Sequence, residues 1–483
     1  MDNSLLKKSL IASIWSSAAE VVAKVISPLV FLILTRILSP ADFGIVAIAT
    51  TILGFTNIIV DVGTAKVLVQ SQLQGKDFKE LCDTAFWINS IFGFTIYLLC
   101  YLGSDFLANI NNTPESSSVI KLMSIQVLFH SLSIVQTAIM RRELNFKVLF
   151  LIRLITVGTP ALISIPIAFY GGGYWSIVIG SVIGSALSCS TLWIKSKWKP
   201  NIRNFTTQIK QKSRILFSKS IWTTIDQIVA FLPLALDTYL ISNYLSPTDL
   251  GLYTSSRTLF SASISFALAP LMPVLFSSFS KLLADKVLFR KSVLIAQKMV
   301  FIVAASLGIL VFGYREYITD ILFDANWHGI ENCIGIIFLV FGLEYFYSAL
   351  LEGIRASGDF KGLAINTTIS TGLTAIVLII TVHYGLIPYV IGRSISLILF
   401  YPGAFYLSKK NIKVSFIDCI INTRKELICI FSFILSVATI EYCIRDYWNK
   451  LIIISFISAI YILSIINSNR ELIKTFKDKL TKK

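Results

Sequence analysis

Charged residues are scarce in this sequence. They make up 14% of its 483 residues, against 55% hydrophobic residues, whereas soluble domains carry about a quarter charged residues. Acidic residues are scarcer than basic ones: there are 27 aspartates and glutamates and 43 lysines and arginines, which gives a net charge of +16. A chain with so few charges does not form an ordinary soluble domain, so its composition places it in a lipid bilayer.

Grouped histidines and cysteines are also lacking. The three histidines, His130, His328 and His383, are isolated, and the seven cysteines are scattered without a C-x-x-C pair. We therefore expect no metal site and no disulfide framework. The sequence contains no glycine-rich loop of the kind that cradles phosphates. We expect no cofactor and no nucleotide hydrolysis.

Long apolar segments are abundant. A helix needs about 20 apolar residues to span a bilayer, and the breaker clusters predict fourteen such helices: 11–37, 43–69, 82–103, 117–139, 149–170, 174–194, 219–241, 249–275, 293–313, 330–351, 362–382, 386–407, 426–444 and 451–467. The first apolar run holds Glu20 and Lys24 and lacks an A-x-A cleavage site, which favours a retained helix over a signal peptide. We expect an all-α membrane protein without a soluble domain.

The basic residues give this helical plan an orientation. With the N-terminus in the cytoplasm, 32 lysines and arginines fall in inner segments and four in outer ones, namely Arg36, Arg315, Arg445 and Lys450. The positive-inside rule then predicts that both termini are cytoplasmic. Because the inner charges lie where anionic headgroups are found, we expect membrane lipids as partners and no nucleic acid.

Two segments recur in the sequence. Leu38–Gly44 (LSPADFG) returns as Leu245–Gly251 (LSPTDLG), displaced by 207, and Arg141 with Phe146-Lys147 returns as Arg355 with Phe360-Lys361, displaced by 214. In the first pair, serine is the expected N-cap, proline the first helical residue and aspartate the charge in the first turn. Two matches in register predict an internal duplication.

The duplication predicts the domain organisation. Residues 1–194 form an N-lobe of helices 1–6, 195–218 a basic cytoplasmic linker, 219–408 a C-lobe of helices 7–12, and 409–483 helices 13–14 with a basic cytoplasmic tail. An even number of helices starts both copies on the same side of the membrane. We therefore expect two six-helix lobes related by a pseudo-two-fold axis along the membrane normal, plus two extra C-terminal helices, with the substrate site between the lobes.

Polar residues inside the spans are the candidate site residues, because a charge at the bilayer centre costs about 2.5–3.5 kcal/mol and needs a partner or a wet cavity. Helix 2 carries Thr50, Gly54, Asn57 and Asp61 on one face, and the 207 displacement aligns Arg257 and Ser261 with the first two. We expect a central hydrophilic cavity. Its expected substrate-binding residues are Arg257, Lys24, Asn57, Ser261, Arg153 and Arg393.

Acids in the spans have two interpretations. Asp61, Asp226, Asp237 and Glu20 could carry a coupling proton or sodium ion, or bind sugar hydroxyls, and Glu344 and Glu352 are further acidic candidates. Glu20 and Lys24 lie one helical turn apart, so a structural ion pair is the alternative for them. A guanidinium such as that of Arg257 suits a phosphate or pyrophosphate group.

The run Thr35–Gly44 (TRILSPADFG), the following Asp61-Val62-Gly63 and the echo at Leu245–Tyr253 resemble the polysaccharide transporter branch of the multidrug/oligosaccharidyl-lipid/polysaccharide superfamily, the bacterial O-antigen, colanic acid and teichuronic acid flippases. The resemblance implies a V-shaped pair of lobes in the bacterial inner membrane that alternate between inward-open and outward-open states. It implies an undecaprenyl-pyrophosphate-linked oligosaccharide as substrate and a basic cavity, for which Arg257 is the fitting residue.

Three alternatives to this interpretation stay open. A drug/cation antiporter or a flippase for lipid-linked peptidoglycan precursors shares the helical plan. A membrane-embedded polysaccharide polymerase or ligase is expected to need a long outer loop, but the longest predicted outer segment is only Gly313–Gly329. We therefore expect a transporter and no enzyme, with a polysaccharide polymerase as a protein partner.

Overall fold

A computed structural model describes residues 3–61, 63–201, 216, 224, 227–268, 271–444 and 446–470. Over these residues the chain is helical and contains no strand. It divides into two compact units, Met1–Thr254 and Ser255–Lys483, here called unit 1 and unit 2. The division falls within a helix and differs from the predicted lobe boundaries, which remain a prediction.

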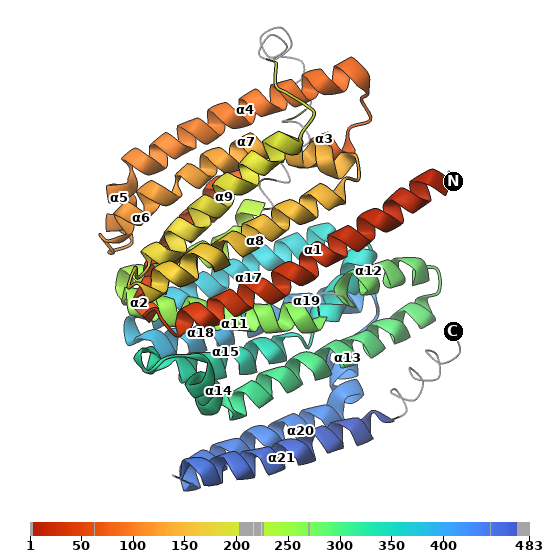
Figure 1. Ribbon diagram of the computed structural model, residues 1–483. Helices are drawn as coiled ribbons and strands as arrows, with labels where there is room; N and C mark the ends of the chain where they lie inside the picture. The colour runs from red at the N-terminus through yellow and green to blue at the C-terminus, as the bar shows by residue number, and fades with distance from the viewer. Residues whose placement is uncertain are drawn as a thin grey trace. The chain divides into compact units, whose positions relative to one another are not determined.

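The helices follow one another with short connections (Figure 1). Unit 1 contains α1 (Asn3–Thr35), α2 (Pro40–Asp61), α3 (Thr64–Gln70), α4 (Gly75–Leu102), α5 (Ser104–Ile110), α6 (Ser116–Met123), α7 (Ile125–Arg142), α8 (Phe146–Phe169), α9 (Trp175–Lys195) and the helical residues 227–244. Helix α11 (Pro247–Leu268) begins in unit 1 and ends in unit 2. Unit 2 continues with α12 (Leu271–Leu282), α13 (Lys286–Gly313), α14 (Arg315–Leu322), η1 (Ala325–Trp327), α15 (Ile330–Glu344), α16 (Ser348–Ala356), α17 (Phe360–Thr381), η2 (Val382–Tyr384), α18 (Leu386–Ile398), α19 (Tyr401–Asn411), α20 (Phe416–Cys443) and α21 (Tyr447–Ser468).

Twelve helical segments of the described residues are long and apolar enough to cross a membrane. They correspond to twelve of the fourteen predicted spans, so the all-α membrane fold is confirmed and the count of fourteen is approximate. The other two predictions are 219–241, which overlaps the helical residues 227–244 and lies partly outside the described residues, and 249–275, which covers α11 and part of α12.

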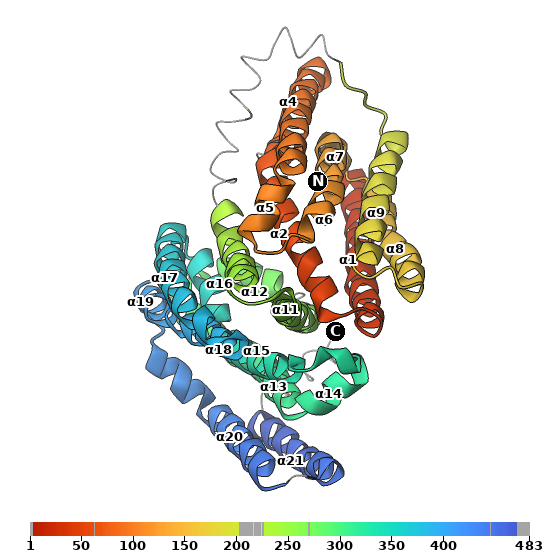
Figure 2. The same ribbon diagram turned by 90° about the vertical axis from the view of Figure 1, so that its left-hand side faces the viewer.

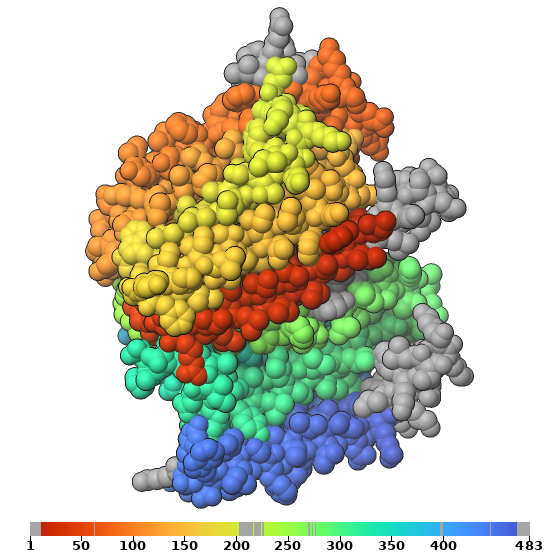
Figure 3. Space-filling view, in the orientation of Figure 1, coloured from red at the N-terminus to blue at the C-terminus, as the bar shows by residue number. Residues whose placement is uncertain are grey.

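Lipid-facing surfaces fit this assignment. Figure 3 shows α1 and α8 side by side on one face of unit 1, in red and orange-yellow. Leu29 of α1 and Leu162 and Phe169 of α8 are exposed, with Leu162 at 79%. Helices that expose many apolar side chains are suited to contact with acyl chains.

The internal duplication extends to helix boundaries. Helices α2 and α11 each have 22 residues, and their starts at Pro40 and Pro247 show the same displacement of 207 as the sequence motif, as do the starts of α3 and α12. Helices α4 and α13 each have 28 residues. Further along, α8 and α17 start at Phe146 and Phe360, which show the second displacement, 214. Several helix starts and lengths in the first part of the described chain therefore recur in the second part.

Four predicted spans contain interruptions that the hydrophobic pattern did not reveal. The span 43–69 is broken at Gly63, whose φ of 68° lies in the left-handed region that glycine adopts at low cost. The span 386–407 restarts with Pro402 in the first turn of α19, because proline lacks the N–H that a continuous helix needs. In 330–351, three successive hydrogen bonds of the i→i−3 type, from Phe346, Tyr347 and Ser348, interrupt the helix after Glu344. The fourth, 117–139, is divided at Ser124.

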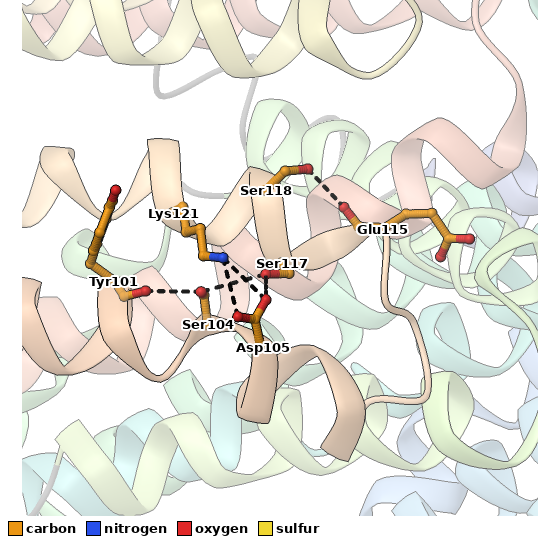
Figure 4. Close-up of polar contacts among 7 residues, drawn as sticks. All are labelled: Tyr101, Ser104, Asp105, Glu115, Ser117, Ser118 and Lys121. Atoms are coloured by element: carbon orange, nitrogen blue, oxygen red, sulfur yellow. Dashed lines mark hydrogen bonds and ion pairs between the residues drawn. The ribbon is translucent and has the colours of Figure 1, made fainter.

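Short helices close one end of unit 1, where α5 and α6 lie side by side (Figure 2). The Asp105 carboxylate of α5 accepts hydrogen bonds from Ser117 and from Lys121 of α6, the latter at 3.1 Å (Figure 4). These bonds hold the pKa of Asp105 below its ordinary value. Asp105 is 70% exposed, so this ion pair orients the turn and contributes little to stability.

The two C-terminal helices belong to unit 2 and lie side by side in both views (Figures 1 and 2). Ion pairs join α20 to α13 and α14: Asp418 with Arg290 at 3.1 Å, Glu426 with Lys298 at 3.0 Å, and Glu441 with Arg315. The Glu426 carboxylate also accepts a hydrogen bond from Asn469 at 2.9 Å. Acidic residues of α20 are thus neutralised by basic residues far away in the sequence.

We expect the Lys298–Glu426 pair to be the most stabilising of these contacts. Glu426 is 1% exposed and Lys298 15%, so Glu426→Leu leaves a poorly hydrated ammonium group and should destabilise the protein by about 3–5 kcal/mol. The double variant Lys298→Met/Glu426→Leu should recover most of this loss. Thermal unfolding of the purified protein measures both, and Asp105→Asn is the control from an exposed pair. A single variant as stable as wild type would contradict the expectation.

Candidate functional site

A cluster of charged side chains lies within unit 2 at the break between α15 and α16. The Glu344 carboxylate, at the end of α15, interacts electrostatically with Arg393 of α18 and Arg257 of α11. Arg393 is 8% exposed, whereas Glu344 and Arg257 are half-buried. The structure therefore brings together two of the predicted cavity residues, although they are far apart in the sequence.

Aromatic residues hold Glu344 in place. The Tyr347 hydroxyl donates a hydrogen bond to the Glu344 carboxylate at 2.8 Å. The Tyr347 ring is buried, stacks on Phe400 with ring centroids 5.1 Å apart and meets the edge of Tyr401 at 4.7 Å. Tyr347 lies at the break between α15 and α16, and Phe400 lies at the break between α18 and α19. Residues at both breaks therefore help to position the Glu344 carboxylate.

An apolar cavity of about 550 Å³ adjoins the cluster. Its lining includes Glu344 and Tyr401 together with apolar side chains from α13, α15, α18 and α20, such as Phe301, Ile395 and Phe431. The cavity is wide enough for part of an acyl or polyprenyl chain. It also shows that α20, which lies outside the duplication, helps to form a wall next to the charged cluster.

The combination of cluster and cavity has a clear chemical consequence. The cluster presents two guanidinium groups, those of Arg257 and Arg393, around the Glu344 carboxylate. Guanidinium groups bind phosphate oxygens through two parallel hydrogen bonds, while the apolar cavity suits a hydrocarbon chain. An amphipathic ligand with an anionic group next to an apolar tail is complementary to both parts.

The polar residues of α2 have mainly structural partners in unit 1. The Asp61 carboxylate accepts hydrogen bonds from the Ala65 amide at 3.1 Å and the Thr64 hydroxyl at 3.3 Å, so it caps α3 across the break. Thr64 in turn accepts one from the buried Asn89 at 2.9 Å. Among the described residues, the buried amide oxygen of Asn57 accepts no hydrogen bond. Asn57 is thus the member of this face with unused polar capacity.

The other predicted site residues are placed as follows. Glu20 and Arg153 are exposed, on α1 and α8, and Lys24 is half-buried on α1. Asp237 is buried and accepts a hydrogen bond from the Tyr253 hydroxyl at 2.9 Å. Ser261 is exposed on α11, and Asp226 lies outside the described residues. Their roles in binding or coupling remain predictions.

The two copies of the repeated motif pack against each other within unit 1. A Cβ atom on Gly44 would lie 1.8 Å from the carbonyl oxygen of Pro247, and one on Gly251 would lie 1.8 Å from the carbonyl oxygen of Pro40. We call these four residues the glycine joint. The contact is reciprocal and between backbones, so only glycine fits at either position.

Capping of both motif copies agrees with the sequence prediction. The backbone amide of Asp42 donates to the Ser39 hydroxyl at 3.3 Å, and that of Asp249 donates to the Ser246 hydroxyl at 3.1 Å. Each serine hydroxyl in turn donates to the carboxylate of its aspartate at 2.6 Å. Asp42 also accepts a hydrogen bond from the Tyr174 amide at 2.9 Å, which ties the motif to the start of α9. These residues therefore shape the joint and are not free to bind a ligand.

Glu344 is the residue of the cluster that sequence reasoning did not place. Its position inside a span marked it as a candidate acid, but it lies far along the chain from Arg257, and no periodicity connects them. The pairing follows from helix packing alone. Among the described residues, no group of histidine, cysteine, aspartate and glutamate could hold a metal ion.

The chain is similar to several known proteins. The model of a family described as "Polysaccharide biosynthesis protein" matches residues 33–332. The chain is 23% identical over 347 residues to the succinoglycan biosynthesis transport protein ExoT of Rhizobium meliloti, covering 71% of this chain and 69% of the relative. It is 22% identical over 450 residues to the lipopolysaccharide biosynthesis protein WzxC of Escherichia coli, covering 86% and 88%. The solved structure of the lipid II flippase MurJ in an inward closed conformation has the same fold, with a TM-score of 0.73, 18% identity, and coverage of 96% of this chain and 100% of that one.

Proposed function

Because the chain belongs to the polysaccharide biosynthesis protein family, we propose that it is a flippase that moves undecaprenyl-pyrophosphate-linked oligosaccharide units from the cytoplasmic to the outer leaflet. The observation that carries the proposal is the Arg257–Arg393–Glu344 cluster beside an apolar cavity. The names of ExoT and WzxC, which concern transport and lipopolysaccharide synthesis, support the substrate class.

In this proposal each part of the ligand has its own contact. Arg257 and Arg393 bind the pyrophosphate, and the cavity lined by Phe301 and Phe431 receives the polyprenyl chain next to it. The sugars stay in a wet space, as polar groups crossing a bilayer must. Glu344 keeps the cluster from binding the pyrophosphate too tightly, because a transporter must also release its substrate.

Alternating access requires the glycine joint to open. The two motif copies follow predicted helices 1 and 7. If both termini are cytoplasmic, these helices end on the outer side of the membrane, so the joint lies there. We infer that separation of α2 from α11 at Gly44 and Gly251 opens the outer side and that reclosure resets the carrier. The lysine and arginine distribution supports this orientation, and the bacterial relatives ExoT and WzxC support the bacterial inner membrane as the location.

The energy source and the partners are part of the same proposal. Asp61, Asp226, Asp237 and Glu20 are the proposed carriers of a coupling proton or sodium ion, since they are acids within predicted spans. A polysaccharide polymerase is the proposed protein partner, because it would consume the translocated units.

Reconstitution tests the function. Proteoliposomes containing the full chain and a fluorescent undecaprenyl-pyrophosphate oligosaccharide should move the label to the opposite leaflet at least about tenfold faster than empty liposomes. An imposed proton or sodium gradient should change that rate. Lipid II and a cationic drug serve as competing substrates: preferential transport of either one would replace the proposal by a peptidoglycan precursor flippase or a drug antiporter.

A further inference from the structure

A polar cavity of about 580 Å³ lies at one end of unit 1, apart from the residues assigned to transport. The start of α4, the end of α7, the end of α9 and the segment 196–201 form its walls. Its basic lining consists of Lys79, Lys195, Lys197 and Lys199, and its acidic lining of Asp83 and Glu143. Four ammonium groups against two carboxylates make the cavity positive.

The more buried carboxylate is already engaged. Asp83 is 2% exposed and accepts a hydrogen bond from the Asn201 amide at 3.2 Å. That bond joins the segment 196–201 to α4, whereas the lysines of the cavity's lining are exposed. The lysines can therefore turn their ammonium groups toward a bound anion without breaking an ion pair with Asp83.

One residue of the lining also carries a buried hydrogen-bond donor. Trp198 belongs to the lining, and its indole N–H is buried and has no acceptor among the described residues. A buried donor without an acceptor is costly, so a ligand oxygen at this place would satisfy it. This orphaned group is independent of the lysines and points to the same chemistry.

Aromatic side chains place the cavity at the depth of lipid headgroups. The Trp193 and Trp198 rings each lie 5.7 Å from the Phe86 ring, and Lys199 lies over Trp193 at 5.4 Å. Tryptophan beside lysine at the end of spanning helices is typical of the membrane interface. A phosphate presented by a lipid in the leaflet would therefore reach the cavity directly.

We propose that this cavity, between α4, α7, α9 and the segment 196–201, binds the phosphate of an anionic phospholipid headgroup. Basic pockets at the cytoplasmic ends of spanning helices suit such lipids, and the positive-inside prediction puts this end in the cytoplasm. The phosphate accepts hydrogen bonds from Trp198 and from Lys195, Lys197 and Lys199. A bound lipid connects the segment 196–201, the first part of the predicted basic linker, to the helices of unit 1.

Native mass spectrometry of the full chain in detergent tests the site with phosphatidylglycerol as the probe. The triple variant Lys195→Gln/Lys197→Gln/Lys199→Gln should bind it at least about tenfold more weakly than wild type, from the loss of three charges near the membrane surface. The matched control is Lys281→Gln/Lys286→Gln/Lys291→Gln, which removes three exposed lysines of unit 2 and should change the affinity less than twofold. Equal weakening in both triples would overturn the proposal, because it would reflect net charge alone.

Two further measurements identify the ligand. Trp198→Phe keeps the ring and removes the N–H, so it should weaken phosphatidylglycerol about threefold to tenfold while the thermal unfolding temperature stays unchanged, and unchanged affinity would contradict the site. Phosphatidylcholine should bind more weakly than phosphatidylglycerol. Displacement of the lipid by millimolar inorganic phosphate would instead assign the cavity to free phosphate and refute a lipid site. These readouts need no flipping, so they are separate from the test of the proposed function.

Discussion

Gly251→Ala is expected to reduce transport at least about tenfold, and Gly44→Ala should do the same. The new Cβ would lie 1.8 Å from a backbone carbonyl oxygen in each case, and backbone atoms cannot turn aside as a flexible side chain can. The two helices must therefore move apart at the glycine joint. Overpacking of this kind typically costs about 1–3 kcal/mol, and under the proposed mechanism it disfavours the closed state of the outer side.

The measurement is surface polysaccharide in cells that depend on each variant, together with flipping in proteoliposomes. Gly158→Ala in α8 and Gly372→Ala in α17 are the matched controls, because a Cβ at either helical glycine meets no atom within 4 Å. The controls should be neutral or slightly stabilising, since alanine favours a helix. Joint variants that transport and unfold like the two controls would show that the close contact is dispensable.

The second large effect is expected from Arg257. Arg257→Ala removes one of the two guanidinium groups that act on Glu344, and hydrogen bonds to charged groups contribute about 1.5–3 kcal/mol each. We expect at least about a tenfold loss of affinity for the lipid-linked pyrophosphate and loss of surface polysaccharide at an unchanged protein level. Arg257→Lys should restore part of the affinity, because lysine keeps the charge but lacks the forked geometry.

Two other variants separate binding from structure. Arg141→Ala removes an exposed arginine outside the cluster and should leave both readouts unchanged. Glu344→Gln removes the negative charge next to the two guanidinium groups and should tighten binding while slowing flipping, because release becomes harder. Normal surface polymer with Arg257→Ala would remove Arg257 from the mechanism.

The features that depend on short stretches of sequence could be predicted: the membrane class, the helix caps and the internal duplication. Apolar windows of about 20 residues gave the membrane class and twelve spans that the structure contains, because the bilayer imposes that length on any helix. The Ser39–Asp42 and Ser246–Asp249 caps followed from local hydrogen bonding. The duplication followed from two displacements, and the helix boundaries repeat it.

The groupings that matter for function came from packing. Arg257, Glu344 and Arg393 lie on three helices, and the partners of the glycine joint are two helix starts that lie far apart in the sequence. The hydrophobic pattern of the sequence continues through the helix breaks at Gly63 and after Glu344, so periodicity did not reveal these breaks. Composition and periodicity report whether a residue prefers lipid or water, and on which helix face it stands. They carry no information on which faces meet, because that choice is made by the fit of side chains across the whole bundle.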